Sequence, residues 1–365
     1  MRTHLFIAAF LLLVACQKAP PPARLPTPQE AAAEQVVVSY GPARLRVFPL
    51  TSSGSHYVLW ASERPGLPAV FRPLGTTEQR SPAAFVPRAG ELAFVDGRIV
   101  EAPLPAASAK AARELTLLSY DQDAKTAMQK TVPLPGPCTM RERALLQSDG
   151  QQLFVLARCA VEDQSMALRL DKTLTAQAAR AVDGAGAVEL FLHHGDSDYL
   201  LQSRQVMRVP PQGLPVIGTV PPPGGDAETR DLVMASDLLL VVDGAAGRVI
   251  GMDRQSMGWK LEKRFYFEGS VQRLRAAASA NRLHIVVAER GEGQKTELVG
   301  IGMSLLPGQR DSRLPQRLLL GAGPAQSDHE LAPIADANES VAGSVLVRSH
   351  DGNTGPLVAL SYLRM

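Results

Sequence analysis

Short apolar runs separated by turn residues recur along most of this chain, and they limit its fold more than any other feature. From Val36 onward each run has about five to eight residues, is partly β-branched or aromatic, and ends at Gly, Pro, Asp or Asn. Such runs predict β-strands, and their boundaries predict tight turns. Stretches with a 3.6-residue period are nearly absent, and only residues 106–113 have a locally helical pattern. We therefore predict an all-β protein.

The predicted strands also recur at a coarser interval. In LTLLSYDQDAKTAMQKTVPLPG a strand ends at Asp121, a polar turn follows, and a second strand runs to Pro-Gly. Asp171 and Asp253 occupy the same place in later hairpins, at separations of 50 and 82 residues, the second being two periods of about 41. Divergent copies lie between and after them, one with Pro210 in place of the aspartate. A repeat of this length with four strands predicts a β-propeller.

Counting the repeats gives seven units, with one strand missing at the end of the chain and one spare at its beginning. The last unit has three clear strands, and the run QVVVSY at residues 35–40 belongs to no unit. Pairing that run with the last unit would close the ring and protect both edges. We predict seven four-stranded blades in a domain of residues 36–365, while eight blades or two β-sandwich domains remain alternatives. The units are 43–80, 83–136, 144–182, 187–222, 229–269, 271–322 and 328–365.

The strand-Asp-turn-strand hairpins resemble the PQQ-like and YVTN-like repeats of bacterial propellers. The resemblance covers three units well and the others loosely. No unit has a full tryptophan-docking motif, because Trp60 and Trp259 each stand alone. Propeller lactonases and quinone enzymes hold calcium or a cofactor on the central axis, so the resemblance leaves an enzyme possible. Acidic residues near predicted strand ends that might converge there are Glu63, Asp96, Asp149, Asp243 and Glu289.

The first sixteen residues, MRTHLFIAAFLLLVAC, have the pattern of an export signal. A short polar start is followed by an apolar run from Leu5 to Val14, which is too short to span a bilayer. The segment from Leu13 to Cys16 resembles the lipobox of bacterial lipoproteins. The resemblance implies a signal peptide at 1–15 and a mature chain that begins at an acylated Cys16. The alternative is an ordinary secretory signal.

A proline-rich segment follows this signal. It lies within residues 16–35, with prolines at 20, 21, 22, 26 and 28. Such segments favour extended polyproline conformations, so we predict a tether that separates the propeller from the membrane. By resemblance to lipoproteins, Gln17 favours the outer membrane of a Gram-negative cell, with the domain on its periplasmic or surface face.

The charge balance argues against one class of partner, and the cysteines predict a covalent cross-link. The chain has 38 basic and 36 acidic residues without a basic stripe, which argues against nucleic-acid binding. Cys138 and Cys159 lie in segments predicted to be neighbouring strands of one unit. In an exported protein they predict a disulfide, and two buried free thiols are the alternative. A reactive thiol is disfavoured because no histidine lies near either cysteine in sequence.

Three local motifs contain residue types that could form a metal, phosphotransfer or phosphate-binding site. His193, His194, Asp196 and Asp198 are metal-ligand types, but adjacent strand residues point to opposite faces, so a hairpin turn is favoured. The phosphotransfer-like LTLLSYDQDAKT has its threonine one place late and is better explained as a hairpin. The segment PPPGGD at 221–226 lacks the lysine of a phosphate loop and is predicted to link two blades.

These observations predict a non-enzymatic envelope lipoprotein whose propeller is a protein-interaction scaffold. Its partners would be membrane lipid, through Cys16, and an envelope protein. We assign no catalytic residue, metal ligand or cofactor. Two alternatives stay open: a lactonase-like hydrolase with an axial metal, and a cell-wall or glycan-binding module. Glycan binding is disfavoured by the low aromatic content of 5%.

Overall fold

The computed structural model describes the chain in segments and places the strands of every predicted unit. For residues 43–73 and from 316 onward it describes strand pairing without side chains. The described residues are 43–49, 56–62, 70–73, 90–103, 113–120, 126–136, 138–140, 144–159, 164–185, 188–278, 281–290, 296–306, 316–319, 329–333, 343–352 and 355–364.

The first half of the chain forms four antiparallel sheets, in each of which the strands pair in sequence order. The first sheet consists of β1 (Ala43–Pro49), β2 (His56–Ser62) and β3 (Val70–Pro73). The second consists of β4 (Gly90–Val95), β5 (Arg98–Pro103), β6 (Glu114–Tyr120) and β7 (Thr126–Pro133). The third consists of β8 (Leu145–Ser148), β9 (Leu153–Arg158), β10 (Gln164–Leu170) and β11 (Ala176–Asp183). The fourth consists of β12 (Leu190–His194), β13 (Ser197–Gln202), β14 (Gln205–Val209) and β15 (Val216–Thr219).

The second half adds three more sheets of the same kind. A short 3-10 helix, η1 (Ala227–Thr229), precedes the fifth. The fifth consists of β16 (Arg230–Ala235), β17 (Leu238–Asp243), β18 (Arg248–Asp253) and β19 (Trp259–Arg264). The sixth consists of β20 (Ser270–Ala278), β21 (Arg282–Arg290), β22 (Thr296–Ser304) and β23 (Gln316–Leu319). The seventh consists of β24 (His329–Pro333), β25 (Gly343–Gly352) and β26 (Gly355–Arg364).

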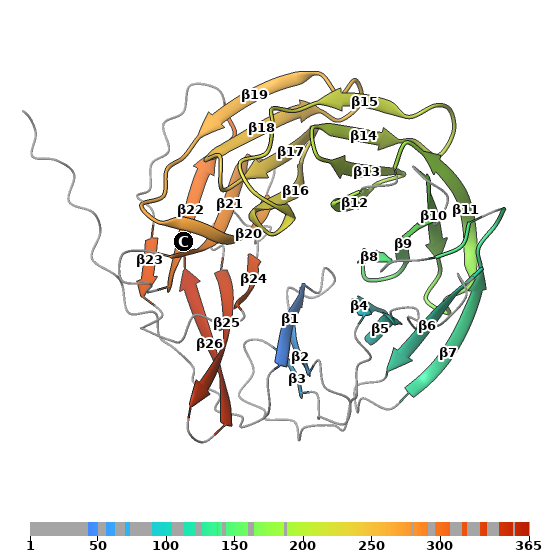
Figure 1. Cartoon of the computed structure of the whole chain (residues 1–365), viewed down its shortest axis with the longest axis horizontal. Helices are drawn as coiled ribbons and strands as arrows, with labels where there is room; N and C mark the ends of the chain where they lie inside the picture. The colour runs from blue at the N-terminus through green and yellow to red at the C-terminus, as the bar shows by residue number, and fades with distance from the viewer. Residues whose placement is uncertain are drawn as a thin grey trace, which may run out of the picture.

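The sheets follow one another around a ring, with the first strand of each sheet toward the centre (Figure 1). The ring closes because β1 of the first sheet contacts β24 of the last. This arrangement is a β-propeller, and the described strands form seven blades, as the repeat predicts. The predicted closure by residues 35–40 lies outside the described residues, as do residues 106–112 of the segment with a helical pattern.

The core lies between neighbouring blades, where the sheets pack face to face. One cluster of buried residues joins the second and third blades through side chains such as Leu117 and Leu153. Three further clusters join the third blade to the fourth, the fourth to the fifth, and the fifth to the sixth. The middle strands supply most of these residues, and β17 has five buried residues in succession. Burial on both faces explains why these strands appear as continuous apolar runs.

Two of the three repeated aspartates, Asp171 and Asp253, are turn residues, and Asp121 lies outside the described residues. Asp171 follows β10, and its carboxylate accepts hydrogen bonds from the backbone N–H groups of Thr173 and Thr175 at 2.8 and 3.0 Å. Asp253 ends β18 and accepts from the N–H of Ser256 at 2.8 Å. The hydrogen bond from the Thr173 hydroxyl is the largest influence that lowers the pKa of Asp171. The period of the sequence therefore reflects a local turn device.

Candidate binding face

The two ends of the blades carry different chain segments. In an up-and-down sheet the hairpin between the first and second strands lies at one end, and the hairpin between the second and third at the other. We call the end with the second hairpins and the inter-blade links the connection face. In the fifth blade the Gly244 N–H donates to the Thr229 carbonyl at 2.9 Å, which places that hairpin beside the incoming link. On the opposite face the Asp96 N–H donates to the Gly150 carbonyl at 2.9 Å.

This arrangement divides the acidic residues that might have formed an axial cluster. Asp96 and Asp149 lie in first hairpins on the opposite face. Asp243 ends β17 and Glu289 lies near the end of β21, both at the connection face. Glu63 lies outside the described residues. The four described residues therefore do not converge, and the axial site that the sequence left open does not form from them.

The histidine pair has the opposed geometry expected from its sequence. His193 and Asp198 face each other across β12 and β13, with the His193 Nδ1 atom 2.7 Å from the Asp198 carboxylate. The His193 Nε2 atom lies 2.9 Å from the Gly195 carbonyl, and its ring stacks on Phe154 of the third blade. His194 lies at the surface, and desolvation of the part of its side chain that is covered lowers its pKa. Among the described residues no group of three His, Cys, Asp or Glu side chains has the arrangement of a metal site.

Cys138 and Cys159 form a disulfide, as predicted, but Cys138 lies in the link before the third blade and not in one of its strands. Their Cα atoms are 4.9 Å apart, and the bridge joins the segment before β8 to the end of β9. Cys138 is fully buried in the cluster between the second and third blades. The bridge is therefore part of the core, which agrees with a structural role and not with a reactive thiol. Cys16 lies outside the described residues, and no helix among the described segments has the length and apolarity needed to cross a bilayer.

A groove of about 290 Å³ opens on the connection face between the fifth and sixth blades. One wall is the hairpin Gly244–Gly247, and the other is the link from Phe265 to Val271. We call this feature the face groove. Asp243 fixes the first wall: its buried carboxylate accepts hydrogen bonds from the Gly224 and Ala246 N–H groups at 3.0 and 2.9 Å. The acidic residue that sequence analysis considered for an axial site therefore positions a hairpin.

Glycines allow the two walls to approach closely. Gly247 has a φ of +61°, and a Cβ atom there would lie 2.4 Å from the Phe265 carbonyl oxygen. The Phe265 N–H in turn donates to the Gly247 carbonyl at 2.9 Å. A side chain at this position would separate the hairpin from the link. The groove therefore depends on glycine both for its turn and for this contact.

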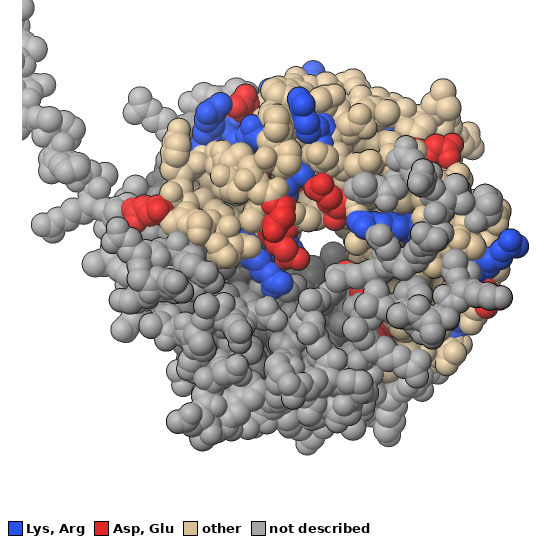
Figure 2. Space-filling view, viewed as in Figure 1, with Lys and Arg blue, Asp and Glu red and all other residues tan. Residues whose placement is uncertain are grey.

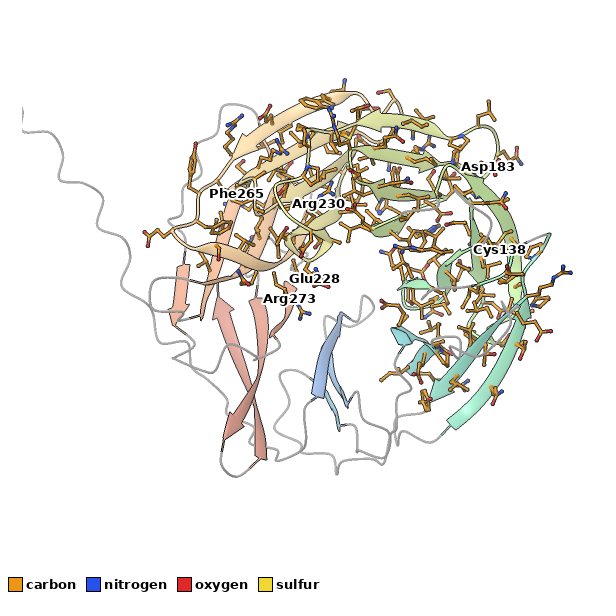
Figure 3. All side chains as sticks on the ribbon, in the orientation of Figure 1. Cys138, Asp183, Glu228, Arg230, Phe265 and Arg273 are labelled. Carbon is orange, nitrogen blue, oxygen red and sulfur yellow. A yellow bond between two sulfur atoms is a disulfide. The ribbon has the colours of Figure 1, made fainter. Side chains whose placement is uncertain are left out.

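Three successive aromatic residues line the second wall. Phe265 is buried and contacts Phe267 edge to face, with ring centroids 5.2 Å apart. Tyr266 lies between them in sequence and is 82% exposed. The labelled Phe265 lies in the link that leaves the outer strand of the fifth blade (Figure 3). The groove thus combines a packed aromatic base with an aromatic ring available for contact.

Charged side chains lie nearer the axis on β16, β20 and η1. Figure 2 shows residues of both signs around the opening at the centre of the ring. Arg273 and Arg275 lie 3.2 and 3.8 Å from the Glu228 carboxylate. Asp231 accepts a hydrogen bond from the Ala276 N–H at 2.8 Å, which joins the inner strands of two blades. Burial raises the pKa of Asp231, although Arg275 acts in the opposite direction. The charges here engage one another across the fifth and sixth blades.

Arg230 makes a comparable connection between the fourth and fifth blades. Its side chain is 1% exposed and lies 2.7 Å from the Glu189 carboxylate. It also donates to the Ser203 carbonyl at 2.8 Å. Figure 3 shows Arg230, Glu228 and Arg273 toward the centre of the ring. We interpret Arg230 as a structural residue because it is buried between two blades.

The face groove was not predicted from the sequence. Its available signal was the FYF segment at residues 265–267, three adjacent aromatics in a chain with only 5% aromatic content. The glycines of the hairpin at 244–247 were a second signal. The aromatic segment and the glycine hairpin lie side by side because β18 pairs with β19. This pairing places Arg248 opposite Arg264 and brings the two walls of the groove together. The segment at 221–226 links two blades, as predicted, because it lies between β15 and β16.

No known protein family and no curated protein matches this sequence. Solved structures match its fold. The match to the Neurospora crassa Pan2 WD40 domain covers 92% of this chain and 98% of that domain, with a TM-score of 0.53 and 9% identity. Kluyveromyces marxianus Hsv2 covers 89% of this chain and 99% of its own, with a TM-score of 0.51 and 8% identity. The BBS1N chain of a complex with ARL6DN covers 91% and 97%, with a TM-score of 0.50 and 11% identity.

The chain is therefore similar in structure to WD40-type β-propellers over about nine-tenths of its length. Identities of 8–11% establish the fold alone. The finer resemblance to PQQ-like and YVTN-like repeats stays a prediction. Because one propeller fold serves many functions, function has to be argued from the surface of this chain.

Proposed function

We propose that this chain is a lipid-anchored envelope protein whose β-propeller is a protein-interaction scaffold with the face groove as its docking site. The observation that carries the proposal is the combination of Tyr266, 82% exposed, with a glycine hairpin held in place by Asp243. Aromatic rings at the centre of an interface supply much of its binding energy. Propellers often serve as interaction scaffolds, which agrees with this assignment.

The groove fits an extended peptide segment better than a compact small molecule. It is lined on both sides by loops, and Gly244, Gly247 and Gly269 have no side chains that would fill it. An extended segment can lie along the groove while one of its apolar side chains packs on the exposed ring of Tyr266. We therefore expect a loop or terminal segment of another envelope protein as the partner.

Site-specific photo-crosslinking in intact cells tests the docking site. The full chain would carry a photoreactive phenylalanine analogue at Tyr266 or, as a control, at Gln255, which is exposed on the opposite face. We expect a discrete protein adduct from position 266 that position 255 does not give. Adducts of equal yield at both positions, or none at 266, would contradict the proposal.

The membrane anchor is supported by the lipobox resemblance of Leu13 to Cys16 and by the proline-rich segment that follows. Stable attachment requires two or more acyl chains, which lipoprotein processing at Cys16 would supply. Labelled palmitate should enter the wild-type chain and not the Cys16→Ser variant. Equal labelling of both chains, or labelling of neither, would refute the anchor and leave the scaffold proposal intact.

A glycan-binding module is the second candidate, and Tyr266 is the observation that favours it. An exposed aromatic ring on a loop can stack against a sugar ring, and a glycan-binding module needs such rings. Tyr266 supplies one although the chain has few aromatic residues. Co-sedimentation with purified peptidoglycan separates the two functions. Binding that is lost in Tyr266→Ala and kept in Gln255→Ala would favour the glycan candidate over a protein partner.

A further inference from the structure

The outer strands of the blades differ in how they protect their exposed edges. Charged residues on an edge strand discourage pairing with another chain. Among the outermost strands that the structure describes, β15 with the sequence VIGT is the only one without such a residue. The others each have at least one, and examples are Arg72 on β3, Lys130 on β7, Arg180 on β11, Lys260 on β19, Arg317 on β23 and Arg364 on β26.

The register of β15 shows which of its backbone groups point outward. The Val220 N–H donates to the Arg204 carbonyl at 2.8 Å, so the backbone groups of Val220 point toward β14. In an antiparallel pair the groups alternate, which turns the N–H and C=O groups of Ile217 and Thr219 away from β14. Trp259 confirms this direction, because its indole Nε1–H donates to the Thr219 carbonyl at 2.6 Å from the neighbouring blade.

Exposed apolar side chains lie along the same edge. Five large hydrophobic residues are exposed among the described residues, and three of them are Leu214, Ile217 and Trp259. Gly218, between the two outward positions, packs against the fifth blade, where a Cβ atom would lie 2.8 Å from the Met257 carbonyl oxygen. The tight contact holds β15 in place. We call residues 214–219 the open edge.

We propose that the open edge binds the open edge of a second copy of this chain, so that two β15 strands pair antiparallel about a two-fold axis at Ile217. Pairing at this register lets each Ile217 N–H donate to the Ile217 carbonyl of the other copy. Each Thr219 N–H then faces the carbonyl of Pro215 in the other copy. The axis also places the exposed Ile217 side chains of the two copies side by side.

One detail favours a second copy over an unrelated strand. At this register the Thr219 carbonyl faces position 215 of the other copy, and proline has no N–H to offer it. That carbonyl needs no donor, because Trp259 already supplies one. Every outward group from 215 to 219 is thus satisfied when the edge pairs with itself. The paired strand is short, so we expect a weak dimer that depends on local concentration.

Cysteine crosslinking of the full chain in intact cells tests the dimer. Ile217→Cys places one thiol of each copy at the axis, and a short bis-maleimide should join them into a dimer of twice the chain mass. The native pair Cys138–Cys159 is bridged and does not compete. Ala178→Cys is the matched control, since Ala178 is also exposed and lies on outer strand β11, which has Arg180 and Asp183. Wild-type chain controls for any other free thiol.

A second substitution tests the backbone pairing itself. Adding Thr219→Pro to Ile217→Cys removes an N–H that points away from β14, so the pairing of β15 with β14 loses no donor, and edge strands tolerate proline at such positions. We expect a dimer yield about tenfold lower, because two symmetric hydrogen bonds are lost. The proposal is overturned if Ile217→Cys gives no more dimer than Ala178→Cys, if Thr219→Pro leaves the yield unchanged, or if the adduct contains a different protein.

Discussion

Replacing Gly247 by alanine tests whether the face groove is built by close backbone contact. The substitution should lower the free energy of unfolding for two reasons, one conformational and one steric. The first is the left-handed φ of +61°, which disfavours an L-residue by about 1–2 kcal/mol. The second is the new Cβ atom, which would lie 2.4 Å from the Phe265 carbonyl oxygen. Moving that backbone apart adds about 1–3 kcal/mol, typical of an overpacked site.

Gly195 provides the control because its φ of +64° is nearly the same and a Cβ atom there has no neighbour within 4 Å. Gly195→Ala should therefore destabilise the protein by the backbone cost alone, about 1–2 kcal/mol. Gly247→Ala should destabilise it by roughly 2–5 kcal/mol, the sum of both costs. Urea unfolding followed by circular dichroism measures both variants. Equal destabilisation would refute the steric argument, and Gly247→Ala should also reduce photo-crosslinking at Tyr266.

Three further predictions concern stability. Removing the disulfide by Cys138→Ala and Cys159→Ala should lower the free energy of unfolding by about 3 kcal/mol, since the bridge closes a loop of 21 residues; unchanged stability in the double variant would count against a structural bridge. Burial raises the pKa of Asp231 in the folded protein above its value in the unfolded chain. As pH rises above 4, the unfolded chain therefore loses this proton first, and the free energy of unfolding falls. Asp231→Asn should therefore show a smaller loss of stability between pH 4 and pH 7 than wild type in urea titrations, and parallel curves would contradict this. Arg230→Ala should cost about 1.5–3 kcal/mol, because it removes a buried guanidinium that bonds Glu189, itself 31% exposed, and the Ser203 carbonyl. Arg254→Ala, at an exposed pair, should cost at most about 1 kcal/mol by thermal unfolding. Similar losses in the two variants would show that the contact of Arg230 with the fourth blade adds nothing to stability.

The blades were predictable from sequence because the signals for strands and turns are local. An apolar run such as residues 238–243 forms a buried strand, and an aspartate such as Asp171 or Asp253 bonds N–H groups within the next four residues. The predicted unit from 187 to 222 contains β12 to β15, and the unit from 229 to 269 contains β16 to β19. Both predictions rest on sequence signals that lie within a single blade.

The face groove and the open edge were not predictable in this way because each depends on contacts between blades or links. Asp243 holds Gly224, which precedes it by 19 residues, and Trp259 donates to Thr219 across 40 residues. An aspartate near a strand end has the same sequence signature whether it is solvated, axial or bonded to a neighbouring link. Only the register of the strands and the packing of the fifth blade against its neighbours decide between these roles.

The distribution of satisfied and unsatisfied groups separates structural residues from binding residues. Near the axis, Glu228 engages both Arg273 and Arg275, and Asp231 accepts the Ala276 N–H, so these groups already hold two blades together. Substitutions there should alter stability before they alter binding. Tyr266 and Ile217 lie at the periphery and remain exposed after folding. Because they add little to the core, their substitution should change association while leaving the unfolding transition nearly unmoved. A Tyr266→Ala or Ile217→Lys variant that unfolds as easily as Arg230→Ala would show that this division of roles is wrong.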